Sequence, residues 1–254
     1  MTETAGRVDI RRAAVDHPTN GVATRRTRGV RARHRQLRGG RILAAFLLVP
    51  VGLVLALVLP VIWIVQGRPL FFRAMRAGQN GVPFRLWKLR TMRNGAREDA
   101  VLGGDAASNV TTLGRWLRRT RLDELPQIVN LLRGDMVFVG PRPPLPRYVE
   151  AYPDLYLPLL SDPPGITGLA TVMFCTRETG LLDEGRTSDE VDALYRRRCL
   201  RRKARLDAIF ARQRGPGLTW FVLILTLWRG PRAQGAMRSV RHRVERWMGL
   251  RPPA

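Results

Sequence analysis

The longest apolar stretch of the chain is ILAAFLLVPVGLVLALVLPVIWIV, residues 42–65, which contains no charged side chain. A helix of this length reaches across the hydrocarbon core of a bilayer, which is about 30 Å thick. The stretch follows an arginine-rich segment that is too long for an ordinary cleaved signal peptide. The pattern therefore predicts a permanent membrane-embedded helix over residues 42–66.

Basic residues lie on both sides of this helix. Residues 1–41 carry eleven arginines and no apolar periodicity, which predicts a disordered basic arm. Residues 67–97 carry seven arginines and Lys88 but no acid. The positive-inside rule places both flanks in the cytoplasm, which favours a re-entrant helix bent at Pro50 or Pro60 over a single crossing. Charge and prolines alone leave both forms open.

Short elements follow the membrane segment. The Asn80-Gly81 pair predicts a turn before a short strand. Leu125, Ile128, Val129 and Leu132 have helical spacing, with Gly134 as the stop signal. Further short strands are expected in MVFVG and PPGITGLATV, a basic helix over 189–213, and a core or interfacial helix over 218–228.

These elements predict an α+β fold that is mainly helical with short strands. An N-terminal re-entrant membrane helix and interfacial helices would surround a small cytoplasmic catalytic domain of residues 67–230. A basic C-terminal tail, residues 231–254, would follow. The length of 254 residues suits one such domain with added segments.

The composition is strongly basic, with 44 Lys and Arg residues and a formal net charge of +24. Such a charge indicates a polyanionic partner and does not distinguish nucleic acid, anionic lipid and a phosphorylated substrate. No helix-turn-helix, zinc-finger or RNA-recognition signature accompanies it, so no specific nucleic acid is expected. Cys175 and Cys199 lie far apart with no CxxC motif, which indicates neither a zinc site nor a disulfide framework.

The acidic pair Asp123-Glu124 stands at the start of the predicted helix, among many arginines. Acids often occur at helix N-termini simply because they cap amides and oppose the dipole. Here the neighbouring cations and the helix N-terminus are expected to keep Asp123 ionised, as a nucleophile or metal ligand requires. Mg²⁺ binds through one or two carboxylates plus substrate phosphates, so a membrane-bound phosphate-handling enzyme is consistent with the pair.

Four segments, in this order, resemble the bacterial sugar transferases, or monotopic phosphoglycosyl transferases. They are GRPLFFRAMRAGQNGVPFRLWKLRTM, LGRWLRRTRLDELPQIVNLLRGDMVFVGPRP, PPGITGLA and YRRRCLRRKARLDAIF. The second segment is the most specific. The resemblance covers roughly residues 41–230 and favours the re-entrant membrane helix, which the family breaks at a Ser-Pro pair. This chain has Val49-Pro50 and Leu59-Pro60 instead, so the position of the hinge stays open.

The resemblance implies transfer of a phosphosugar from a UDP-sugar to polyprenyl phosphate, usually undecaprenyl phosphate, with release of UMP. It implies Asp123 as the nucleophile, with Glu124 beside it helping to hold Mg²⁺. Lys88 and Arg142 fall on motif positions that would contact phosphates, and Arg90 and Arg177 join them as candidate phosphate-binding residues. The implied location is the cytoplasmic face of the bacterial inner membrane, where the reaction would start exopolysaccharide, capsule or other glycoconjugate synthesis.

Three positions depart from the family pattern: Ala74 replaces a common glutamine, Cys175 stands near a common arginine with Arg177 as substitute, and an expected aspartate falls near Thr219. Alternatives therefore remain open at this stage. Asp123 could be a metal ligand only, with polyprenyl phosphate attacking directly. The chain could also be a degenerate relative acting as a membrane scaffold, or a basic membrane protein that binds nucleic acid or anionic lipid.

Overall fold

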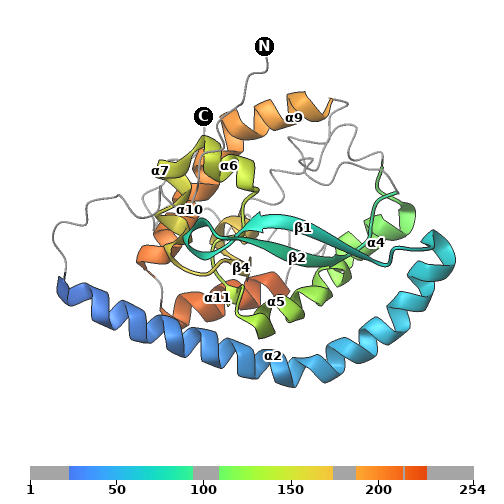
Figure 1. Ribbon diagram of the computed structural model, residues 1–254, viewed down its shortest axis with the longest axis horizontal. Coiled ribbons are helices and arrows are strands. Elements are labelled where there is room, and N and C mark those ends of the chain that lie inside the picture. The colour runs from blue at the N-terminus through green and yellow to red at the C-terminus, as the bar shows by residue number, and fades with distance from the viewer. Residues whose placement is uncertain (1–22, 94–108, 174–186, 214, 228–254) are drawn as a thin grey trace, which may run out of the picture.

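The computed structural model describes residues 23–93, 109–173, 187–213 and 215–227 (Figure 1). The predicted class, mainly helical with a few short strands, is confirmed. The elements are α2 (Ala23–Gln66), β1 (Phe71–Ala77), η1 (Gln79–Gly81), β2 (Pro83–Leu89), α4 (Thr112–Thr120), η2 (Leu122–Gln127), α5 (Ile128–Arg133), β3 (Val137–Val139), α6 (Pro146–Ala151), α7 (Pro153–Tyr156), η3 (Leu159–Ser161), β4 (Gly165–Thr167), α9 (Ser188–Leu194), η4 (Tyr195–Leu200), α10 (Arg201–Arg212) and α11 (Pro216–Leu227).

The apolar stretch belongs to one long helix, α2. This helix begins at Ala23, so the second half of the basic arm predicted over residues 1–41 is helical and continuous with the membrane segment. Both Pro50 and Pro60 lie inside it. Figure 1 shows α2 as a continuous curve whose concave side faces the rest of the molecule. The helix is therefore not interrupted at either of the two prolines that we expected to act as a hinge.

Both halves of the apolar part of α2 pack against the domain. Ala44 is fully buried in a cluster with Leu131 and Met136, and Ile62 is fully buried with Leu89 and Leu117. The outer face is exposed and apolar, and the segment Gly39–Gln66 is long and apolar enough to cross a membrane. Its most exposed large side chains are Phe46, Val49, Leu53, Leu57, Ile64 and Val65.

Strands β1 and β2 form an antiparallel hairpin whose register pairs Phe72 with Lys88 and Arg76 with Phe84. The predicted turn is confirmed, because Asn80 and Gly81 both adopt positive φ, 55° and 75°. Directly paired residues of an antiparallel ladder project from the same face of the sheet. The register therefore places the even-numbered residues of both strands, including Lys88 and Arg76, on one face.

The acidic pair lies in a short 3₁₀ helix, η2, rather than in the first turn of the α-helix as predicted. Helix α4 ends at Arg121, whose φ of 58° reverses the chain direction. Pro126 lies within η2, where its missing N–H is tolerated because the regular α-helical bonds begin only in α5. Gly134 ends α5 with a φ of 85°, as predicted from its position.

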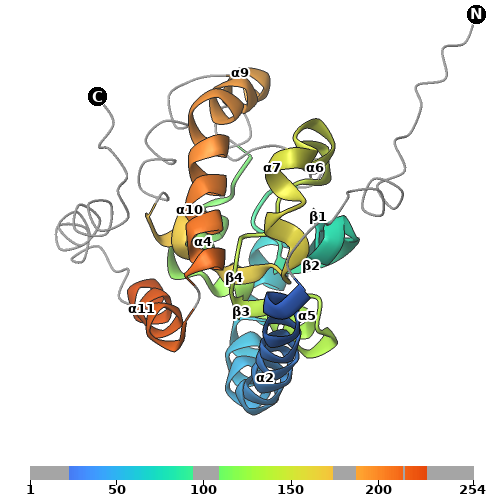
Figure 2. The same ribbon diagram turned by 90° about the vertical axis from the view of Figure 1, so that its left-hand side faces the viewer.

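Strands β3 and β4 form a short parallel pair in which Val137 lies opposite Gly165 and Val139 opposite Thr167. A Cβ atom on Gly165 would lie 2.1 Å from the amide nitrogen of Gly140, so this close approach requires glycine. The predicted strands in MVFVG and PPGITGLATV are thereby confirmed, as are the helices expected over 189–213 and 218–228. In Figure 2, α10 rises beside α6 and α7, while α11 lies at the same lower side of the molecule as α2.

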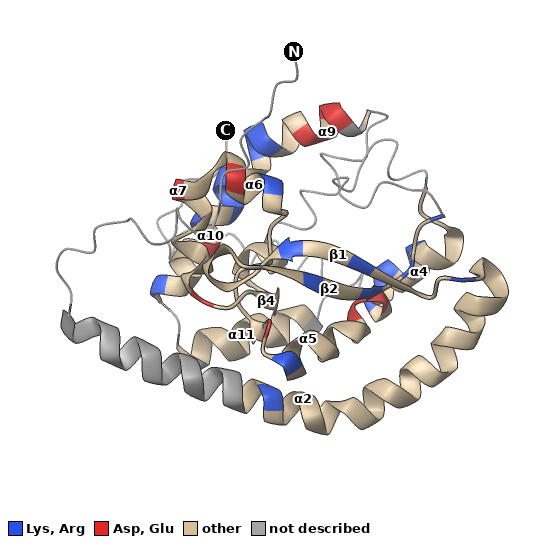
Figure 3. Cartoon of the chain, in the orientation of Figure 1, with Lys and Arg blue, Asp and Glu red and all other residues tan. Residues whose placement is uncertain are grey.

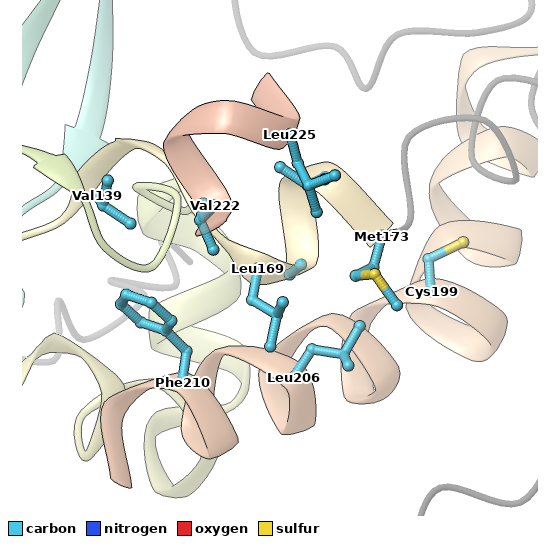
Figure 4. Packing of buried hydrophobic residues seen from close by; sticks show 10 residues of the cluster. Val139, Leu169, Met173, Cys199, Leu206, Phe210, Val222 and Leu225 are labelled. Carbon is cyan, nitrogen blue, oxygen red and sulfur yellow. The ribbon is translucent and has the colours of Figure 1, made fainter. Parts of the chain in front are cut away.

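The largest core cluster joins β3 to α10 and α11. Phe210 and Leu206 of α10 meet Val222 and Leu225 of α11 around Leu169, as Figure 4 shows. Cys199 is a buried member of this cluster, while Cys175 lies outside the described residues. The core thus fixes the helices behind the loop that follows β3, which carries the Gly-Pro-Arg-Pro motif.

Candidate active site

Four of the predicted site residues meet at one place. Lys88 Nζ of β2 lies 3.4 Å from Glu124 Oε1 and 3.9 Å from Asp123 Oδ2. Arg142 Nη2, from the loop after β3, lies 2.7 Å from Glu124 Oε1, and Arg121 Nη1 lies 3.2 Å from Glu124 Oε2. Figure 3 shows the acidic segment between α4 and α5 beside the basic residues of β2 and α4. Three separate segments therefore converge on this pair.

The acidic pair is held in place through Asn130 of α5. Its Oδ1 accepts the backbone N–H of Trp87 at 3.1 Å, and its Nδ2 donates to the carbonyl of Arg85 at 2.8 Å. Asn130 is fully buried, so these bonds lock α5 and the preceding 3₁₀ helix against strand β2. The contact sets the distance between Lys88 and the two carboxylates.

The two carboxylates have opposite electrostatic environments. Burial pushes the pKa of Glu124 upward, but Arg142, Lys88 and Arg121 outweigh that effect and hold it well below its ordinary value. Burial instead raises the pKa of Asp123, assisted by the charge of Glu124 and only partly opposed by Lys88. We expected the neighbouring cations to keep Asp123 ionised. Lys88, Arg118 and Arg142 do favour the ionised form, but burial outweighs them and leaves the pKa of Asp123 above its ordinary value.

Two further arginines that sequence reasoning did not single out as site residues belong to this group: Arg118 acts on Asp123, and Arg76 lies beside Arg142 and Lys88. Arg118 Nε donates to Thr91 Oγ1 at 2.9 Å, and burial lowers its pKa while the charge of Asp123 opposes that shift. Burial, followed by the nearby Arg142, lowers the pKa of Arg76 to about 10. The signal available in the sequence was the position of Arg118, five residues before Asp123 in the most specific motif segment.

Arg90 is placed away from the acidic pair. Its Nη1 donates to the carbonyl of Arg68 at 2.9 Å, and its Nη2 donates to the carbonyls of Gly67, at 2.9 Å, and Gln66. These are the unsatisfied carbonyls at the C-terminal end of α2, where a cation also opposes the helix dipole. Arg90 therefore anchors the end of the membrane helix to the hairpin, and the phosphate binding expected of it stays a prediction.

The remaining sequence candidates are distributed as follows. Arg177 and Cys175 lie outside the described residues. Ala74 is buried on the hairpin face that also carries Lys88. The hydroxyl of Thr219 donates to the carbonyl of Gly215 in its own helix, at 2.9 Å. Where the family has an aspartate, this chain therefore has a threonine whose hydroxyl bonds to the backbone at the start of α11.

The donor set for Mg²⁺ consists of the two adjacent carboxylates. No group of three or more His, Cys, Asp and Glu side chains occurs among the described residues. Both oxygens of Glu124 lie in ion pairs, whereas the ion-pair partner of Asp123 is Lys88 at 3.9 Å. The set fits a magnesium ion that completes its coordination with substrate phosphates and water, the usual arrangement for this cation.

The site as a whole combines an acid whose oxygens are little engaged with a cluster of cations. Four cationic side chains, those of Lys88, Arg118, Arg121 and Arg142, act on the two carboxylates, and Arg76 lies beside Lys88 and Arg142. Such an excess of positive charge favours a polyanionic ligand, and a partly buried carboxylate beside it is a candidate nucleophile. The arrangement is suited to reactions of phosphate esters or anhydrides.

Comparison with known proteins agrees with this chemistry. The family model described as bacterial sugar transferase matches residues 38–230, which is most of the chain. The chain belongs to the bacterial sugar transferase family. The matched part of this sugar transferase includes the membrane helix from residue 38 onward and every described residue of the candidate site.

Curated relatives carry related names. A UDP-glucose:undecaprenyl-phosphate glucose-1-phosphate transferase of Klebsiella pneumoniae is 36% identical over 160 residues, 61% of this chain and 34% of the relative. The uncharacterized sugar transferase EpsL of Bacillus subtilis is 37% identical over 129 residues, 51% of this chain and 63% of the relative. A UDP-N-acetylgalactosamine-undecaprenyl-phosphate N-acetylgalactosaminephosphotransferase of Aeromonas hydrophila is 35% identical over 142 residues, 54% and 33% of the two chains. The matches thus span between about a third and just under two thirds of these relatives.

Proposed function

We propose that this sugar transferase moves a phosphosugar from a UDP-sugar to polyprenyl phosphate and releases UMP. The observation that carries the proposal is the meeting of Lys88, Arg142 and the Asp123-Glu124 pair in a chain of this family. The names of the curated relatives support undecaprenyl phosphate as the acceptor class and a UDP-sugar as the donor class.

We assign the nucleophile to Asp123. A carboxylate oxygen of Asp123 forms a bond to the β-phosphorus of the donor, while the bond from that phosphorus to the bridging oxygen breaks. UMP departs with the electron pair, and an acyl phosphate links the sugar to the protein. Asp123 suits this role because its oxygens are less engaged than those of Glu124, and its raised pKa makes the ionised form the stronger nucleophile.

The second transfer regenerates the carboxylate. An oxygen of polyprenyl phosphate attacks the same phosphorus, the acyl-phosphate bond breaks, and Asp123 leaves as a carboxylate. We assign Lys88 and Arg142 to binding the phosphoryl oxygens in both steps, and the contact of each with Glu124 beside the nucleophile supports this assignment. Glu124 thus orients both cations, which is why its own charge is so strongly stabilised.

We propose that Mg²⁺ is held by Asp123 and Glu124 together with the donor diphosphate. When bound, the ion would neutralise phosphate charge and polarise the phosphorus centre. Activity is therefore expected to disappear in excess chelator and to return with added Mg²⁺. Full turnover in chelator would remove the metal from the proposal and leave the assignment of Asp123 intact.

We propose a re-entrant arrangement of α2, with both flanks at the cytoplasmic face of the inner membrane. Buried contacts from Ala44 to Ile62 keep both halves of the apolar segment against the catalytic domain. A straight crossing would carry that domain into the hydrocarbon, whereas a curved helix with an exposed apolar outer face needs only shallow insertion. Helix α11 lies at the same side of the molecule as α2 (Figure 2), and its exposed Trp220 and Ile224 would supply further interfacial contacts.

The test is UMP release by the full chain in membranes or detergent, across a panel of UDP-sugars and without acceptor. A covalent intermediate predicts one equivalent of UMP per active site and transfer of the sugar label to the protein. Asp123→Asn should abolish both signals.

A ternary-complex kinetic pattern without a labelled intermediate would refute the nucleophile and favour Asp123 as a metal ligand with direct attack by the lipid phosphate. No turnover with any UDP-sugar would favour a scaffolding relative. Strong, salt-dependent DNA binding by a chain lacking residues 1–40 would instead support the basic binding protein.

A further inference from the structure

Arg76 in β1 is a half-buried arginine that no carboxylate neutralises within the described part of the chain. Its Nε is inaccessible to solvent and has no hydrogen-bond partner. Burial lowers its pKa to about 10, and the neighbouring charges of Arg142 and Arg147 add to that effect. An unpaired buried cation costs folding free energy, so its presence calls for a compensating ligand.

Arg76 projects from the same face of the hairpin as Lys88. The register pairs Phe72 with Lys88, Ala74 with Leu86 and Arg76 with Phe84, so these side chains share one face. The end of β1 also joins the loop of the Gly-Pro-Arg-Pro motif, because the N–H of Ala77 donates to the carbonyl of Pro144 at 3.0 Å. Arg76 therefore stands beside the active site, on the side of Arg142.

The two arginines next to Arg76, Arg142 and Arg147, pair with Glu124 and Asp192, and each of these acids has further partners. Asp192 accepts from Arg147 Nη2 at 2.8 Å, from Arg196 Nε at 2.7 Å and from the hydroxyl of Tyr148. Glu124 accepts from Lys88, Arg121 and Arg142. Because both carboxylates have their own cations, the charge of Arg76 is left for a ligand.

We propose that Arg76 binds a second phosphate group, distinct from the phosphorus that Asp123 attacks. The inference rests on the proposed function, whose substrates supply two such groups: the phosphate that leaves as UMP and the phosphate of the polyprenyl acceptor. A planar guanidinium suits either one, because it donates two parallel hydrogen bonds to phosphate oxygens. Arg76 and Arg142 together would flank the departing or arriving phosphate while Lys88 remains at the reacting one.

The experiment measures equilibrium binding to the full chain in detergent. UMP is compared with uridine, and a short-chain prenyl phosphate with the corresponding alcohol, so that each pair isolates the phosphate contribution. The variant is Arg76→Met, which keeps the length of the side chain and removes its charge. Arg85→Met is the matched control, because Arg85 is exposed on β2 and projects from the opposite face of the same hairpin.

Arg76→Met is expected to weaken UMP binding by about tenfold to a hundredfold, the range for losing a hydrogen-bonded charge pair. Uridine binding, and UMP binding by Arg85→Met, should not change. The thermal midpoint of Arg76→Met should equal or exceed that of the wild type, because the substitution removes an unpaired buried charge. Weakened prenyl phosphate binding with unchanged UMP binding would assign Arg76 to the acceptor phosphate instead.

Two results would overturn the inference. One is unchanged binding of both phosphates by Arg76→Met when the wild-type chain binds them, which would leave the proposed function standing. The other is a lower thermal midpoint together with equal losses of phosphate and non-phosphate ligands, which would make Arg76 a structural residue. A wild-type chain that binds neither phosphate and transfers no sugar would overturn the proposed function as well.

Discussion

The guanidinium of Arg142 lies 2.7 Å from Glu124 Oε1, which ties the Gly-Pro-Arg-Pro loop to the 3₁₀ helix of the acidic pair. The side chain of Glu124 is largely buried while that of Arg142 is about one-third exposed. A charge-assisted hydrogen bond in such a setting contributes both stability and orientation.

The first prediction concerns this ion pair. Glu124→Gln and Arg142→Met should each lower the free energy of unfolding, by about 2 kcal/mol, because each weakens a charge-assisted hydrogen bond in a partly buried setting. The double variant should lose less than the sum of the two, since the second substitution cannot remove a contact that the first has already removed. Denaturation of the two single variants and the double variant measures this coupling. Strict additivity would show that the contact contributes nothing.

The second prediction contrasts Asp123 with Glu124. Because burial raises the pKa of Asp123, its charged form is disfavoured in the folded protein. Asp123→Asn should therefore keep or raise the thermal midpoint at neutral pH, while turnover and covalent labelling are lost. Glu124→Gln should lower both stability and activity. If Asp123→Asn unfolded the protein as Glu124→Gln does, the electrostatic distinction between the two acids would be wrong.

The third prediction concerns Arg90, which donates to three carbonyls at the end of α2. Arg90→Met should lower the thermal midpoint and expose the segment after Gln66 to protease. UMP binding per folded molecule should stay near the wild-type value. Lys88→Met is the comparison, because it should weaken phosphate binding instead. A selective loss of UMP affinity in Arg90→Met would restore the phosphate-binding role predicted from the sequence.

The fourth prediction is a pH dependence that belongs to Asp207 of α10. Burial raises its pKa to about 7, partly opposed by the N–H of Ala170 and by Lys203. The unfolded chain releases this proton near pH 4, an ordinary carboxyl value of about 3.9. The stability from this group is thus fully present below that pH and is lost as pH rises toward 7.

Asp207→Asn removes this titration. The difference between the thermal midpoint of the variant and that of the wild type should therefore increase between about pH 5 and pH 7 and remain constant above pH 7. Circular dichroism melts across this range provide the measurement. A difference between the two proteins that does not change with pH would show that Asp207 titrates normally.

The fifth prediction concerns the topology of α2. In a chain whose Cys175 and Cys199 are replaced by alanine, single cysteines at Val30 and Val82 should react with a membrane-impermeant reagent from the same side. Both flanks are basic, and the helix between them packs along the domain. A cysteine at Leu53, on the exposed outer face of the helix, should resist the same reagent. Labelling of positions 30 and 82 from opposite sides would establish a crossing helix.

The sequence by itself determined the parts that depend on local pattern. The uncharged run of residues 42–65 indicated a membrane or another apolar setting, because exposing so much apolar surface to water is unfavourable. Asn80-Gly81 set the hairpin turn and Gly134 ended α5, because each occupies a positive-φ position that most residues avoid. The family motifs also singled out Lys88 and Arg142, as phosphate-binding residues, while their contacts with Glu124 came from the structure.

Only the tertiary structure decided how charge is shared among these groups. Arg90 and Lys88 are only two residues apart in sequence. Lys88, in β2, meets the carboxylates, whereas Arg90, just after the end of β2, donates to carbonyls at the end of α2. Likewise the pKa of Asp123 is raised although several arginines lie near it in sequence. Burial outweighs their effect on Asp123, and Arg121 and Arg142 form their ion pairs with Glu124. The electrostatics of a buried acid depend on distances and desolvation across the fold, and neither can be read from spacing along the chain.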